Sequence, residues 1–168
     1  MYLTFAQLVV SPGALEIAQV ASTSHAAELV DAELMERTLL GTDRSGFDAA
    51  AIAAADKAAL RIQELIDESA AVIDGYLARR YTLPLPTAPQ ILTTWARDIL
   101  RYKLQPDREG DDRTDPVIRR YRDATKFLEL VAAGKFSLGI EDPEVSAATE
   151  GDIRFDSGTK VFGRGALP

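Results

Sequence analysis

The sequence predicts an all-α protein, a helical bundle of about five helices around one long central helix, with an extended C-terminal arm. Residues 48–80 contain no proline and no glycine before Gly75, and their apolar residues recur every three or four positions, as in an amphipathic helix. Capping residues precede several other apolar segments, as they do at helix N-termini. Beyond Gly139 the helical period is lost. We therefore expect a helical domain over residues 1–139 and an arm over residues 140–168.

Two short helices are expected at the N-terminus. The Thr4 hydroxyl can cap a helix over residues 5–10 by accepting a free backbone N–H. Ser11-Pro12 then places a capping serine before a proline, which favours the first position of a second helix. A third helix is expected over about residues 27–40, and Gly41 interrupts it.

The long central helix is expected over residues 48–80, with Asp48 as its N-cap. Its many alanines favour the helical conformation and allow close helix packing. One stripe of residues at alternating spacings of three and four is predicted to face the core: Ile52, Ala55, Ala59, Ile62, Ile66, Ser69, Ile73, Tyr76 and Arg80.

Two further helices are expected after the segment 81–89, whose three prolines exclude a helix. The first begins near Pro89, with Thr87 as a possible cap, and its inner face is Leu92, Trp95, Ile99 and Tyr102. The second begins at Asp115-Pro116 and ends at Gly134. Its inner face is predicted to hold Val117, Ile118, Tyr121, Thr125, Leu128, Val131 and Ala132.

Composition excludes several kinds of site. The chain has no cysteine, which rules out disulfides, iron–sulfur clusters and thiolate zinc sites, and its single histidine, His25, excludes a two-histidine zinc site. No nucleophile motif accompanies that histidine, so neither a catalytic residue nor a cofactor or metal is expected. No apolar run approaches the roughly 20 residues that cross a bilayer, and the N-terminus lacks a basic signal region. We expect a soluble protein, made in the cytoplasm, with no membrane partner.

A net charge of −7 argues against nucleic acid as the main partner, because the chain as a whole repels phosphates. The exception is a basic cluster on the last expected helix. There Arg119, Arg122 and Lys126 share one side. This cluster is either a solvated face, a contact with an acidic protein such as a neighbouring subunit, or a phosphate-binding surface.

The C-terminal segment is the strongest indication of an interaction. Residues 141–158 hold six acids and one arginine, and the apolar residues that follow or interrupt them lack a core of their own. A short β-hairpin of residues 152–155 and 159–162 is possible, folded back on the bundle. The alternative is docking onto another subunit. The candidate contact residues are Ile153, Phe155, Val161, Phe162, Arg164 and Leu167.

Several runs of residues carry a likeness to a known family. They are Met1-Tyr-Leu-Thr, Ile73-Asp-Gly-Tyr-Leu-Ala-Arg-Arg-Tyr-Thr-Leu-Pro-Leu85, Trp95-Ala-Arg-Asp-Ile-Leu-Arg-Tyr-Lys-Leu104, Arg120-Tyr-Arg-Asp-Ala, Ala133-Gly-Lys-Phe-Ser-Leu-Gly139 and Lys160-Val-Phe-Gly-Arg164. In this order they resemble the Mu-like head–tail connector family of tailed bacteriophages. The chain departs from that pattern over about residues 21–50.

The resemblance implies a non-enzymatic structural protein of the virion neck. In that family the adaptor forms a ring, commonly a dodecamer, below the portal protein, extends the DNA channel, and is the platform for the next neck or tail protein. The partners so implied are the portal, neighbouring copies of the chain and the downstream protein, while DNA passes without specific binding. The C-terminal arm is then expected to grasp the portal or a neighbour.

Three other functions stay open. The first is a different neck or tail component, such as a completion or terminator protein. The second is a helical enzyme acting through carboxylates, for which no motif is present. The third is a helical regulator that binds nucleic acid, which conflicts with the acidic charge.

Overall fold

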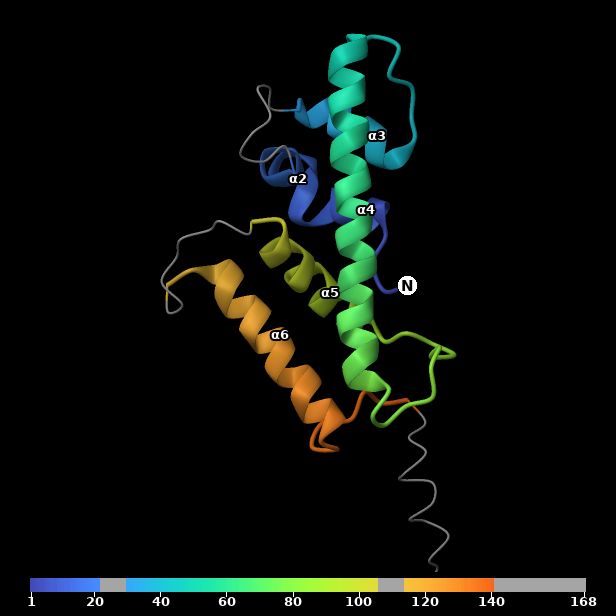
Figure 1. The fold of residues 1–168 in the computed structure, drawn as a ribbon, viewed down its shortest axis with the longest axis vertical. Helices are drawn as coiled ribbons and strands as arrows, with labels where there is room; N and C mark the ends of the chain where they lie inside the picture. The colour runs from blue at the N-terminus through green and yellow to red at the C-terminus, as the bar shows by residue number, and fades with distance from the viewer. Residues whose placement is uncertain (22–29, 106–113, 141–168) are drawn as a thin grey trace, which may run out of the picture.

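The computed structural model describes residues 1–21, 30–105 and 114–140, and these residues confirm the all-α prediction. Their elements are α1 (Phe5–Leu8), the irregular turn η1 (Val9–Gly13), α2 (Ala14–Ala21), α3 (Ala32–Leu40), α4 (Ala49–Leu77), α5 (Gln90–Lys103) and α6 (Pro116–Ala132). The 29-residue α4 runs from one end of the bundle to the other, with α2 and α3 beside one half and α5 and α6 beside the other (Figure 1). The predicted central helix is therefore correct.

The buried face of α4 differs from the predicted stripe at both ends. Its buried residues are Ala55, Ala58, Ile62, Ile66, Ser69, Ile73 and Leu77. The prediction is right for Ala55 and from Ile62 to Ile73, but Ala58 replaces Ala59 and Leu77 replaces Tyr76. The other predicted stripe residues are only half-buried: Ile52, Ala59, Tyr76 and Arg80. A stripe averaging 3.5 residues rotates by about 20° per heptad relative to a straight helix, so an extrapolated stripe fails away from its centre. The buried Ser69 hydroxyl is satisfied because it donates to the Leu65 carbonyl at 2.7 Å.

The N-terminal helices begin and end differently from the prediction. Thr4 does cap α1: its hydroxyl accepts from the backbone N–H of Gln7, whose side chain accepts in return from the Thr4 N–H. The second helix starts at Ala14 and not at Pro12, because Gly13 has a φ of 108°, which no right-handed helix contains. The α1 helix ends at Leu8, before the predicted end at residue 10.

The α3 helix is shorter than the predicted segment 27–40. Its N-cap is Asp31, whose carboxylate accepts the backbone N–H groups of Glu33 at 2.8 Å and Leu34 at 3.1 Å. A strong cap of this kind defines the first turn, so the helix begins at Ala32; residues 27–29 lie outside the described residues. Gly41, with a φ of 67°, ends the helix as predicted.

The remaining helix ends are set by local chemistry. The N-cap position of α5 is Pro89, with no side-chain cap, so the Thr87 cap is wrong. Asp115 caps α6 by accepting from the Val117 N–H at 2.8 Å, with Pro116 as the first helical residue, as predicted. Gly134, with a φ of 72°, ends that helix. The α4 helix ends at Leu77 instead of residue 80, because the chain turns there toward the proline-rich segment.

Polar contacts between distant residues tie the bundle together. Arg101 on α5 donates to the Glu16 carboxylate on α2 from Nε at 2.6 Å and from a terminal nitrogen at 2.5 Å. After α6, Leu138 is buried and its N–H donates to the Tyr81 hydroxyl at 3.4 Å, and Ile140 packs against the core. The described chain therefore ends packed against the α4 end of the bundle.

Candidate functional site

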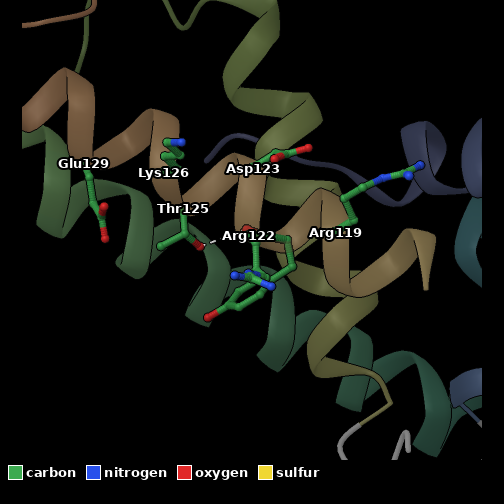
Figure 2. A pocket seen from close by; sticks show the side chains of 7 residues that line it. Arg119, Arg122, Asp123, Thr125, Lys126 and Glu129 are labelled. Atoms are coloured by element: carbon green, nitrogen blue, oxygen red, sulfur yellow. Dashed lines mark hydrogen bonds between the residues drawn. The ribbon is translucent and has the colours of Figure 1, made fainter. Parts of the chain in front are cut away.

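The basic cluster predicted from the sequence lies together on the solvent face of α6. Arg119, Arg122 and Lys126 are all exposed. They line an open groove of about 540 Å³, whose other lining residues among those described are Tyr121, Asp123, Thr125 and Glu129. In Figure 2 the side chains of Arg122 and Glu129 lie along one edge of α6, and those of Asp123 and Lys126 along the other. Cations therefore stand on both edges.

The packing of α6 explains why this face stays open. Val117, Ala124, Leu128 and Val131 are buried and hold the opposite side of the helix against the core. From Arg119 to Glu129 the groove extends about 15 Å along the helix axis at 1.5 Å per residue. Because a well-packed helix presents it, the groove is a preformed surface.

One lining residue of the groove, Tyr121, stacks on a tyrosine of α5. The rings of Tyr102 on α5 and Tyr121 on α6 lie 4.0 Å apart at an angle of 9°. The Thr125 hydroxyl donates to the Tyr121 carbonyl at 2.9 Å. Tyr102 was predicted on the inner face of α5 but is exposed, because Leu100 and Leu104 fill the core there. Its ring is instead covered on one side by Tyr121.

The electrostatics of the groove are mixed, with an excess of positive charge. Asp123 is four residues from Arg119 and three from Lys126, so it partly offsets both. Next to α6, burial raises the pKa of the Asp98 carboxyl on α5, although the nearby guanidinium of Arg120 acts in the opposite direction. The charged form of Asp98 is therefore disfavoured in the folded protein.

Exposed apolar side chains form further candidate contacts that the sequence prediction missed. Phe127 is 40% exposed although its ring stacks on Trp95 at 6.0 Å and meets Phe136 edge-on at 5.4 Å. Val10 is 85% exposed and Leu60 is 67% exposed. Phe127 and Leu60 are apolar residues that lie off the predicted apolar stripes of their helices. That position could have indicated exposure, but a prediction based only on the spacing of inner-face residues disregards it.

The other predicted features fall elsewhere. The arm residues Ile153, Phe155, Val161, Phe162, Arg164 and Leu167 lie outside the described residues, as do the possible hairpin and His25. Among residues 1–21, 30–105 and 114–140, no three histidine, aspartate or glutamate side chains gather as a metal site. Within the same residues no helix is long and apolar enough to span a bilayer.

Comparison with known proteins identifies the family. Residues 2–157 match the family described as "Bacteriophage Mu, Gp36". The chain belongs to the bacteriophage Mu Gp36 family.

Two relatives show how far the similarity extends. The "Mu-like prophage FluMu protein gp36" of Haemophilus influenzae is 36% identical over 104 residues, which cover 62% of this chain and 71% of that protein. "Gene product J" of Escherichia phage Mu is 31% identical over 104 residues, which cover 61% of this chain and 70% of the relative. The chain is thus a phage protein of the Gp36 family with a helical fold.

Proposed function

We propose that this Gp36-family chain is the head–tail adaptor of a tailed phage particle. In this role copies of the chain form a ring below the portal, extend the DNA channel and provide the platform for the next neck or tail protein. The site of action is the neck of the virion, and no chemical step is part of the function.

Family membership carries the proposal. The match to a bacteriophage Mu family covers residues 2–157, which is nearly all of the chain. Within it, the motifs around Tyr76, Trp95 and Arg120 follow the order of the head–tail connectors that the chain resembles. A structural role in a phage particle accounts for such a match without requiring a catalytic site.

The surface chemistry supports the same role. In a ring each subunit binds its two neighbours through two different surfaces, because the contacts are heterologous. The α6 groove and the exposed Val10 and Leu60 offer such surfaces on separate elements. The net charge of −7 suits a channel through which DNA slides, because like charges prevent phosphate neutralisation.

Co-sedimentation with the portal ring encoded in the same genome tests the proposal. The full-length chain is expected to sediment with the ring in stoichiometric amount. A chain truncated after Ile140, which keeps that residue against the core, is expected to stay in the supernatant. The full-length variant Phe155→Ala/Phe162→Ala should behave like the truncated chain.

Matched controls distinguish the loss of a binding contact from the loss of folding. The variant Ser157→Ala/Thr159→Ala changes neighbouring polar residues of the arm and should still bind, and circular dichroism should show the same helix content in every variant. Equal binding by the truncated chain would show that the arm does not make the contact. No binding by any form would refute the adaptor role at the portal.

A neck or tail completion or terminator protein is the second candidate. It has the same family support but a different neighbour. Sedimentation with the tail tube or tail-completion protein of the same genome, and not with the portal, would establish it.

A further inference from the structure

We propose that the α6 groove of one copy receives the acidic segment 141–152 of a neighbouring copy. This inference rests on the proposed function, because it requires copies of the chain to lie side by side. It assigns the basic cluster a partner of stated chemistry, a carboxylate-rich extended peptide from the same protein.

The groove has the chemistry to bind carboxylates. Arg119 and Arg122 carry planar guanidinium groups that can form paired hydrogen bonds with a carboxylate, and Lys126 adds a third cation on the other edge. The three side chains are exposed, so a ligand reaches them without any rearrangement of the core. Tyr121, whose ring stacks on that of Tyr102, lines the groove and offers an apolar surface against which a peptide backbone can lie.

The segment 141–152 has the matching composition. It contains Glu141, Asp142, Glu144, Glu150 and Asp152 and no lysine or arginine. In an extended chain Asp142 and Glu144 stand about 7 Å apart, at about 3.3 Å per residue. Arg122 and Lys126 are about 6 Å apart along the helix axis. The spacing of the two carboxylates is thus close to the axial spacing of two cations, whose long side chains can reach toward a peptide lying between them.

Nucleic acid fits the groove less well than this peptide. Asp123 and Glu129 line the groove beside the cations, and a phosphate backbone places a charge opposite every position. The peptide can instead place neutral residues there, because Val145 to Thr149 carry no charge.

The position of the chain end favours a neighbour over the same copy. Leu138 is held against Tyr81 beside the end of α4. In Figure 1 the last described residues pass beneath that end, whereas the first turns of α6, with Arg119 and Arg122, lie at the opposite end of α6. The described chain thus ends away from Arg119 and Arg122 of its own groove. In the proposed ring each chain end also has the groove of a neighbouring copy to occupy.

Cysteine cross-linking tests the proposal because the natural chain has no cysteine. One full-length protein carries Val145→Cys in the arm, and a second carries Glu129→Cys in the groove. They are mixed under mild oxidation, alone and with portal rings. A disulfide-linked heterodimer should form about tenfold faster than with the control partner Ala71→Cys, whose cysteine is on the exposed face of α4, since three exposed ion pairs together provide about that preference.

Charge reversal provides the second measurement. Adding Arg119→Glu and Arg122→Glu to the groove protein should reduce the rate to that of the control. Adding Lys57→Glu and Arg79→Glu, which reverse two exposed cations outside the groove, should leave the rate unchanged. The heterodimer should also form more slowly at high salt, because exposed ion pairs are screened.

Each contrary outcome overturns a different part of the proposal. A third protein carries both Val145→Cys and Glu129→Cys. If a cross-link formed within this single chain while the two single-cysteine proteins gave no heterodimer, the arm would bind its own groove. Loss of the cross-link on adding duplex DNA, with a gel shift that Arg119→Glu abolishes, would make the groove a nucleic-acid surface. No cross-link above the control, with or without portal, would refute any contact. Portal sedimentation is scored separately, so failure of the adaptor role and failure of this contact are distinguishable.

Discussion

Replacing Leu77 by alanine provides the sharpest test of the α4 packing. Leu77 is 0% exposed at the end of α4, whereas Leu60 on the same helix is 67% exposed. The change removes three carbon atoms, worth about 2.4 kcal/mol at about 0.8 kcal/mol each. A cavity term brings the expected cost of Leu77→Ala to about 3 kcal/mol, whereas Leu60→Ala should change stability by less than about 0.5 kcal/mol.

Urea unfolding followed by circular dichroism measures both variants. For a chain of this length about 3 kcal/mol corresponds to a lowering of Tm by roughly 6–12 °C. Tyr76→Ala should fall between the two leucine variants, because Tyr76 is half-buried. If Leu60→Ala were as destabilising as Leu77→Ala, or if Tyr76→Ala cost the most, the assigned rotation of α4 would be wrong.

Three further variants test local features. Asp31→Ala removes the acceptor of two N–H groups at the start of α3 and should cost about 1 kcal/mol in urea unfolding, with Asp31→Ser restoring most of it. Gly134→Ala should lower the free energy of unfolding by about 1 kcal/mol or more, because φ is 72° and the new Cβ would lie 3.3 Å from an Arg80 nitrogen. An unchanged urea midpoint would show that alanine fits this position without strain. The raised pKa of Asp98 means that the folded state binds its proton more tightly, so stability falls as pH rises from about the ordinary value of 3.8 through the folded pKa. Asp98→Asn should therefore be more stable than the natural chain at pH 7 and equal to it below that window. A destabilised variant at pH 7 would show that the electrostatic attraction of Asp98 to the nearby Arg120 outweighs the cost of its burial.

The position of the α6 groove depends on long-range packing, whereas its charge is visible in the sequence. Arg119, Arg122 and Lys126 are predictable as one side of a helix, since the helical period alone brings them together. The stacking of Tyr121, at the groove, on Tyr102 is not predictable, because it depends on how α5 crosses α6. The same holds for the exposed Phe127, whose contact with Trp95 joins two helices.

Helix starts and ends were most predictable where one residue decides them. Thr4, Asp48 and Asp115 cap helices as expected, and Gly41 and Gly134 end them. These predictions succeed because a cap is a hydrogen bond between residues two or three apart, which depends little on the rest of the chain. The predicted start of α2 at Pro12 is wrong because the Ser11-Pro12 pattern does not take the next residue into account. Gly13 can adopt a positive φ, which a helix cannot contain.

The amino-acid order alone therefore determined the all-α class, the long α4, the acidic charge and most helix limits, because these depend on composition and short-range hydrogen bonds. Tertiary structure decided which side of α4 is buried at its ends, where Leu77 and not Tyr76 fills the core. It also decided the ion pair of Glu16 with Arg101, 85 residues apart. The physical reason is that the rotation of each helix is chosen by the shape of its neighbours, and a long helix drifts away from any regular stripe before those neighbours are known.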